Sequence, residues 1–176
     1  MSPLPLKLDW AVKNELNSDE SLKWTGQPMP YKRMISTLGI CWFGIPLVIV
    51  IGIQQNWEGS FNQILGTFFG IGMLLWPFRC FFKAKKTVYV ITNKRAFTLE
   101  LWSGKLGPGK NIDNYCVDST GVIEKTVRSD GSGDLILARE YCSNCGGEGD
   151  EVTSKYGFFT IKNVNEVDLI IKKLFK

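Results

Sequence analysis

Two cysteines separated by two residues, Cys142 and Cys145, form the pattern in this sequence with the most chemical potential. Zinc usually takes four ligands, which two Cys-x-x-Cys pairs often supply together. Only one such pair exists here, so a metal site would need Cys116 and a carboxylate such as Glu148 or Asp150, or a second chain. The pair could also form a reversible dithiol, or be inert within a loop. We expect no bound metal and no cofactor.

The chain contains no histidine. Histidine acid–base catalysis, histidine metal ligation and Ser-His or Cys-His nucleophile pairs are therefore excluded. The glycine-rich stretches 104–109 and 131–133 do not stand between a strand and a helix, so we interpret them as turns rather than phosphate loops. No paired carboxylates are recognisable, and we predict that the protein is not an enzyme.

A group of basic residues surrounds the end of the second apolar segment. In chain order these are Arg79, Lys83, Lys85, Lys86, Lys94 and Arg95. Each charge near an anionic membrane surface contributes about 1 kcal/mol, so the group could contact lipid headgroups, or simply set the topology. Residues 87–176 hold as many acidic as basic residues, so the sequence offers no basic face and predicts no nucleic-acid partner.

Two long apolar runs predict two transmembrane helices, 34–53 and 61–82. The first carries no charge, and about twenty residues cover the roughly 30 Å hydrocarbon core of a bilayer. The only charge in the second is Arg79, close enough to the end for its long side chain to reach the headgroups. The alternative interpretation is a pair of buried helices in a soluble core.

The flanks of these runs predict their orientation. The connection 54–60 lacks Lys and Arg, whereas Lys32 and Arg33 precede the first run and several basic residues follow the second. Since such residues prefer the cytoplasmic side, we expect an external loop, cytoplasmic termini and a multi-pass protein of the inner (plasma) membrane. Gly66 and Gly70 have the small-xxx-small spacing of close helix packing, within the hairpin or against an oligomer or partner.

The remaining segments predict a small β-rich domain. Segment 1–33 includes a short amphipathic helix at 8–16, which could lie on the membrane surface. After the membrane, residues 83–176 alternate as strands and end in a helix at 164–175, with a glycine-rich acidic loop at 140–156. The expected strands are 87–92, 95–102, 112–117, 122–128, 134–139 and 157–161. The predicted fold class is α+β, a two-helix transmembrane hairpin plus a small antiparallel barrel capped by a C-terminal helix.

Four pieces of sequence resemble a family. They are ESLKWTGQP (20–28), TVYVITNKRA (87–96), RSDGSGDL (128–135) and GFFTIKNV (157–164). In this order around a two-helix hairpin, the sequence resembles the bacterial membrane-anchored pleckstrin-homology-like (PH-like) proteins, from about residue 15 to the end. The resemblance implies a cytoplasmic PH-like barrel for binding or scaffolding. The loop around Cys142 and Cys145 is not part of it.

Three hypotheses follow. The first is a non-enzymatic, membrane-anchored binding or scaffolding module whose head engages a protein at the cytoplasmic surface. The second is an accessory subunit of a larger membrane complex, with Gly66, Gly70 and Gly72 on the contact face. The third is a thiol- or metal-dependent regulator built on Cys142 and Cys145. The expected partners are the lipid bilayer and a membrane or cytoplasmic protein, a second copy included.

Overall fold

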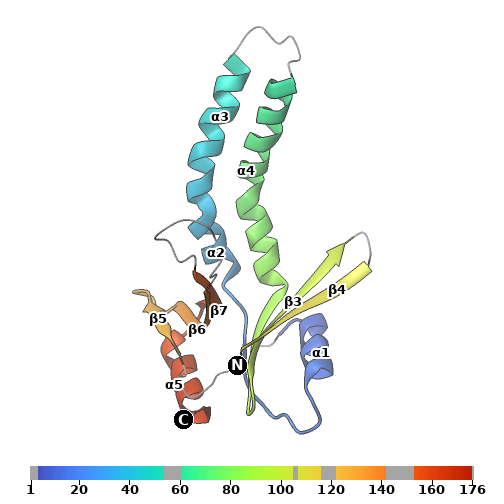
Figure 1. Ribbon diagram of the computed structural model, residues 1–176, viewed down its shortest axis with the longest axis vertical. Helices are drawn as coiled ribbons and strands as arrows, with labels where there is room; N and C mark the ends of the chain where they lie inside the picture. Colours follow the sequence, from blue (N-terminus) through green and yellow to red (C-terminus); the bar gives the residue numbers. More distant parts are fainter. Residues whose placement is uncertain (1–3, 54–60, 105–106, 116–121, 142–152, 176) are drawn as a thin grey trace. The chain divides into compact units, whose positions relative to one another are not determined.

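The computed structural model describes residues 4–53, 61–104, 107–115, 122–141 and 153–175. The chain forms two compact units. The hairpin is the helical unit Pro30–Lys85, and the head combines Met1–Met29 with Lys86–Lys176 (Figure 1). The hairpin is therefore an insertion in the sequence of the head.

The first sheet of the head has four antiparallel strands in the order β1-β2-β3-β4. Their bounds are β1 Leu22–Gly26, β2 Thr87–Thr92, β3 Ala96–Gly104 and β4 Gly107–Tyr115. Strand β2 is buried along its whole length: Val88 and Val90 face one apolar cluster, while Tyr89 and Ile91 face another. The sequence of a strand that is covered on both faces is typically a continuous run of β-branched and aromatic residues, and β2 has such a sequence.

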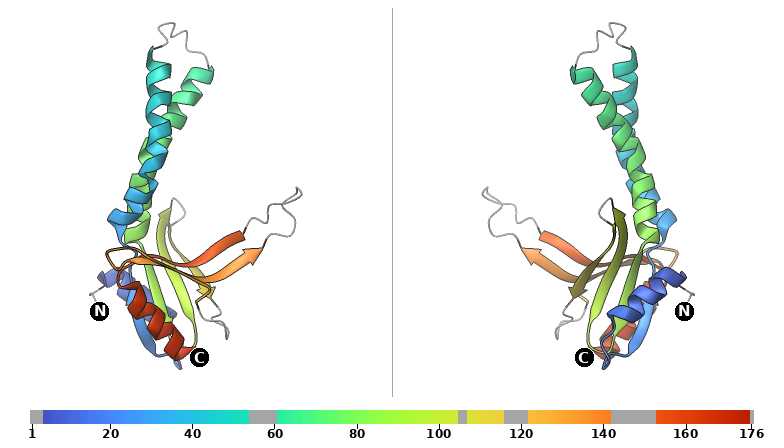
Figure 2. Two further views of the ribbon diagram at one scale, coloured as in Figure 1. Left: turned by 90° about the vertical axis from the view of Figure 1, so that its left-hand side faces the viewer. Right: turned by 90° about the vertical axis from the view of Figure 1, so that its right-hand side faces the viewer.

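The second sheet has three antiparallel strands in the order β5-β6-β7. They are β5 Glu124–Val127, β6 Gly133–Tyr141 and β7 Thr153–Ile161, and β6 and β7 form a long bent pair (Figure 2). Helix α5, Val164–Leu174, follows β7 and buries one stripe of side chains in the core between the sheets. In that core the Tyr89 and Phe158 rings stack with their centroids 4.7 Å apart.

Helix α1, Leu6–Glu15, packs on the outer face of the first sheet. Leu8 and Val12 join Val88 and Phe97 in one buried cluster. The apolar stripe that the sequence suggested for the membrane surface is thus covered by β2 and β3. The side chains of Leu6 and Trp10, on the other side of α1, are exposed.

The hairpin consists of α2 Pro30–Thr37, a 3-10 turn η1 Leu38–Ile40, α3 Cys41–Ile53 and α4 Phe61–Lys85. Helices α3 and α4 lie side by side in every view (Figures 1 and 2). Within the described residues, the segment Leu65–Lys85 of α4 is long and apolar enough to cross a membrane. The first expected span, 34–53, is divided instead among α2, η1 and α3. Where α2 gives way to η1, the Thr37 hydroxyl donates to the Met34 carbonyl at 2.8 Å, a bond of the kind that often bends helices.

Pairing extends the strands beyond their expected ends. The stretch 104–109 was predicted to be a loop, but β3 and β4 pair from Ala96 with Tyr115 to Gly104 with Gly107. A β-carbon at Gly109 would lie 2.4 Å from Trp102 Nε1, so this glycine leaves room for the indole ring. Likewise β6 continues to Tyr141 and β7 begins at Thr153, inside the region predicted as a loop.

Candidate functional site

Basic side chains gather at one end of the hairpin. Lys32 and Arg33 lie in α2, which packs against α4, and Lys83 and Lys85 lie in the last turn of α4. Arg79 lies about one turn before Lys83. Cations at a helix C-terminus also complement the helix dipole. This cationic end is where the chain enters and leaves the hairpin.

Two of these basic residues lie over aromatic rings. The Arg79 guanidinium carbon is 5.8 Å from the centroid of Trp76, and Lys85 Nζ is 4.5 Å from that of Phe81. Cation–π contacts of this kind stabilise a cation by about 0.5–1 kcal/mol at exposed sites. These contacts fix the direction of both cations on α4.

Arg95 does not belong to this cationic end. Its Nε donates to Glu20 Oε1 at 2.9 Å, and its two terminal nitrogens donate to Glu20 Oε2, Asn114 Oδ1 and the Glu15 carbonyl. The Glu20 side chain is only 3% exposed, whereas that of Arg95 is 23% exposed. Arg95 therefore holds the N-terminal segment against the first sheet.

Lys94 has a similar role at the surface. It forms an ion pair with Asp19, and the hydrogen bond and charge of Lys94 lower the pKa of this carboxyl. Of the expected basic residues, Arg79, Lys83 and Lys85 thus belong to the hairpin, and Lys94 and Arg95 pair with residues of the head. The acidic residues at 15–20 were the signal for this separation. Lys86, the first residue of the head after the hairpin, is exposed and accepts a backbone hydrogen bond from Leu101.

The two helices of the hairpin approach closely at glycines. A β-carbon on Gly44 of α3 would lie 3.0 Å from Met73 Cβ and 3.3 Å from the Gly70 carbonyl oxygen. Gly70 is buried and Gly66 is half-buried. Gly70 therefore faces α3, and Gly44 is a packing residue that the spacing of Gly66 and Gly70 did not indicate.

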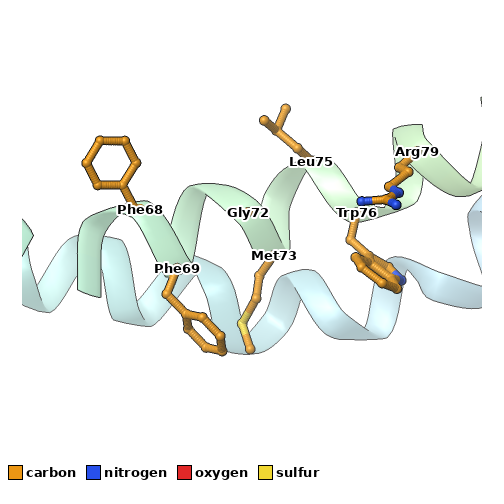
Figure 3. Close-up of a pocket in the computed structure, with 7 residues that line it drawn as sticks. All are labelled: Phe68, Phe69, Gly72, Met73, Leu75, Trp76 and Arg79. Atoms are coloured by element: carbon orange, nitrogen blue, oxygen red, sulfur yellow. The ribbon is translucent and has the colours of Figure 1, made fainter. Parts of the chain in front are cut away.

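An open apolar groove of about 590 Å³ runs along α4 (Figure 3). Phe68 and Leu75 project on one side of it, and Phe69 and Trp76 project on the other. Gly72 lies between these rows, where a β-carbon would meet no atom within 4 Å. The groove exists because the one residue without a side chain stands between large apolar neighbours.

The head has a polar pocket of about 490 Å³ beside β1. Lys23 and Gln27 line it from the β1 side, and Lys162, Asn163 and Glu166 line it from the junction of β7 and α5. Among the described strands, β1 pairs with β2 alone, so its other edge lies open. An open strand edge with mixed charges nearby suits an extended polypeptide partner.

The junction of β7 and α5 is held in an unusual conformation. Thr160 has φ 53°, in the left-handed region that β-branched residues rarely adopt. Its N–H donates to Asp134 Oδ1 at 2.6 Å, and its carbonyl accepts from the Met29 N–H at 2.9 Å. The Val164 N–H, in the first turn of α5, donates to the Gly131 carbonyl. The turn between β5 and β6 and the start of β6 therefore hold the junction of β7 and α5 on this side of the pocket.

No known family, curated protein or solved structure matches this chain. The PH-like resemblance therefore rests on the four pieces of sequence that carry it.

The cysteine candidates Cys142, Cys145 and Cys116 lie outside the described residues, as do Glu148 and Asp150. In the part of the chain that the structure describes, no three His, Cys, Asp or Glu side chains are grouped as metal ligands. Cys41 and Cys80 of the hairpin are half-buried free thiols.

Two buried polar groups of the head are engaged in the core. Burial raises the pKa of Asp168, but hydrogen bonds and charges from Lys125 and Lys172 outweigh it, so the pKa lies below its ordinary value. Burial raises the pKa of Tyr115 to about 12, and its hydroxyl shares a 2.9 Å hydrogen bond with Thr98. Asp168 connects α5 to β5, and Tyr115 connects β4 to β3, so both act in folding.

Proposed function

We propose that this chain is a non-enzymatic binding or scaffolding module, anchored by its hairpin in the membrane, with a PH-like head that binds a partner protein. The supporting observation is the apolar surface of the hairpin. Trp42 is 79% exposed, Phe43 75% and Phe68 72%. A contiguous surface of this kind is unfavourable in water, whereas the hydrocarbon core of a bilayer solvates it.

The charges support the proposed orientation. Lys32, Arg33, Lys83 and Lys85 lie at the end of the hairpin where the chain enters and leaves it. By the preference of such residues for the cytoplasmic side, the termini and the head are cytoplasmic and residues 54–60 are external. Both α3 and α4 span the membrane in this arrangement, with the α2 turns adding length before α3.

The architecture of the head supports the PH-like proposal. It has a four-stranded and a three-stranded antiparallel sheet, closed by one C-terminal helix. The proposal assigns the head to binding, and the absence of histidine excludes histidine-based catalysis there. The polar pocket beside β1 is the binding surface that we assign to the partner.

A second candidate function is an accessory subunit that docks through the hairpin. One observation favours it: Gly72 leaves an unfilled apolar groove on α4. Gly70, in contrast, is occupied by its contact with Gly44, so the docking face of this version centres on Gly72.

Membrane integration is tested first. We expect the full chain to stay with membranes after extraction at alkaline pH. In a cysteine-free variant, a thiol introduced at Ser60 should react with an impermeant reagent only from outside intact cells. One introduced at Lys110 should react only after lysis. Release by alkali, or labelling of both positions from the same side, would contradict the proposal.

The binding surface is tested by purifying a tagged chain from its native membranes in mild detergent. A partner lost with Lys23→Glu and Lys162→Glu, and kept with Lys7→Glu on the exposed side of α1, supports the leading proposal. A partner lost only with Gly72→Leu supports the accessory subunit instead.

A further inference from the structure

The groove on α4 has a polar end. Arg79 closes it, with the guanidinium directed back along the helix toward Trp76 (Figure 3). Trp76 therefore lines the groove and also holds the cation in place. A groove that is apolar along its length and cationic at one end is complementary to an amphiphile with an anionic head.

The length of the groove corresponds to one lipid leaflet. From Phe68 to Arg79, eleven residues of helix rise about 16 Å. The hydrocarbon core of a bilayer is about 30 Å thick, so each leaflet contributes about half of that. Arg79 lies about 9 Å before Lys85, the end of α4. Its guanidinium is directed away from that end, toward Trp76, and a long side chain can turn toward the headgroup region when it binds a phosphate there.

We propose that this groove binds an acyl chain of an anionic glycerophospholipid, with the lipid phosphate on Arg79. The chain lies between the row of Phe68 and Leu75 and the row of Phe69 and Trp76, over Gly72. The inference rests on the proposed membrane location of the hairpin. It goes beyond anchoring because it assigns a specific lipid class to a specific side of α4.

Charge complementarity favours a lipid over a second copy of this chain. A helix docked over the groove would cover the Arg79 guanidinium and would have to supply an anion. The hairpin sequence contains one acidic residue, Glu58, in the connection at the other end of α4. The hairpin of a parallel copy therefore brings no carboxylate to Arg79, whereas a lipid phosphate accepts both hydrogen bonds of the guanidinium fork.

The lipid is expected to be anionic rather than zwitterionic. Lys83 follows Arg79 by about one turn, and Lys32, Arg33 and Lys85 lie at the same end of the hairpin. A net negative headgroup gains from this local potential, at about 1 kcal/mol per basic residue near the surface. Part of this preference for an anionic lipid comes from direct contact between Arg79 and the phosphate.

The test uses the full chain reconstituted in phosphatidylcholine vesicles with and without phosphatidylglycerol. Lipid selectivity is measured with spin-labelled phosphatidylglycerol and phosphatidylcholine, together with the lipid retained after detergent extraction. Wild type should prefer phosphatidylglycerol. Arg79→Gln should reduce that preference about fivefold, the equivalent of about 1 kcal/mol, and Arg79→Lys should retain most of it.

The Gly72→Leu variant distinguishes binding of the acyl chain in the groove from attraction of the headgroup to the basic residues. It fills the groove without changing any charge, so the retained phosphatidylglycerol should be lost. Gly39→Leu, at another glycine with open space around it, should retain the lipid. Lipid retention that is equal in Gly72→Leu and wild type would overturn the inference.

The two proposals fail differently. If the chain does not co-migrate with vesicles of either composition in a flotation gradient, the proposed membrane anchor and the lipid site are both wrong. A chain that inserts but shows no preference for phosphatidylglycerol overturns the lipid site alone.

Discussion

Arg95 and Glu20 form a hydrogen-bonded ion pair across 75 positions of sequence, with Nε and Oε1 2.9 Å apart. The whole hairpin lies between them in the chain. The pair therefore joins the segment before the hairpin to the turn between β2 and β3 after it. This contact holds the two parts of the head together where the chain is interrupted.

Glu20→Gln should lower the free energy of unfolding of the head by about 2 kcal/mol. Removing one partner of a buried ion pair costs about 3–5 kcal/mol, and the partial exposure of Arg95, which keeps its Asn114 bond, reduces this. Hydrogen–deuterium exchange of the β2 amides in the full chain should accelerate about thirtyfold.

Asp19→Asn is the matched control, because the Lys94–Asp19 pair is adjacent in sequence but exposed on both sides. Exposed pairs contribute little, so exchange in β2 should be unchanged. Equal acceleration in the two variants would show that burial of Glu20 has no special role.

Gly44→Leu should separate α3 from α4. Its side chain would enter the space of Met73 and the Gly70 carbonyl, and overpacking of this kind costs about 1–3 kcal/mol. Thermal unfolding in detergent should show a lower midpoint for Gly44→Leu than for wild type. Gly39→Leu, whose side chain meets open space, should unfold at the wild-type midpoint. A stable Gly44→Leu variant would mean that the helices do not touch at this glycine.

Asp168→Asn should change how stability depends on pH. The pKa of Asp168 is lower in the folded state than its ordinary value of 3.8, so the carboxylate stabilises the head above that value. This contribution is lost as the pH falls through the folded-state pKa. The stability difference between wild type and Asp168→Asn should therefore be largest near neutral pH and shrink below about pH 4.

The lysine partners of Asp168 give an internal comparison. The Lys125 side chain is 33% exposed and that of Lys172 is 60% exposed. Lys125→Met should therefore destabilise the head more than Lys172→Met, because the less exposed pair is less screened. A wild-type advantage over Asp168→Asn that stays constant down to about pH 3 would contradict the pKa direction.

Tyr115→Phe should cost about 1 kcal/mol near neutral pH, because Thr98 loses its buried partner. Above about pH 10 the unfolded tyrosine releases its proton, while the folded one keeps it until about pH 12. The wild type should therefore lose stability in this range and the variant should lose less. Alkaline unfolding followed by circular dichroism tests both effects. Parallel curves for the two proteins would rule out a buried, protonated hydroxyl.

Local patterns in the sequence were sufficient for the α+β class and for several elements. The run of β-branched and aromatic residues at 87–92 is β2, and the helix predicted at 164–175 is α5, Val164–Leu174. These segments carry the periodicity of their own structure, so neighbouring residues determine them. The glycines at 104–109 predicted a loop, and the connection of β3 to β4 does lie there, but both strands reach further into this stretch than expected, to Gly104 and from Gly107.

The separation of the basic residues could not be predicted in the same way. Lys94 and Arg95 closely follow the predicted second span in sequence, which suggested lipid contact, and their partners in the structure come from residues 15–20. Pairing between charges so distant in sequence follows from the register of β1 on β2, which places Leu22 opposite Thr92. The groove on α4 was also unforeseen, although Gly72 among large apolar residues was its signal in the sequence.

The insertion of the hairpin between β1 and β2 has a consequence for biosynthesis. Leu22–Gly26 leaves the ribosome before the hairpin, and its partner strand Thr87–Thr92 leaves after it. If the hairpin is a membrane anchor, as proposed, the first 29 residues have no partner strand until the hairpin has been synthesised and can insert. On that proposal the hairpin can insert before the first sheet of the head forms, so the side of the membrane is set before the head folds.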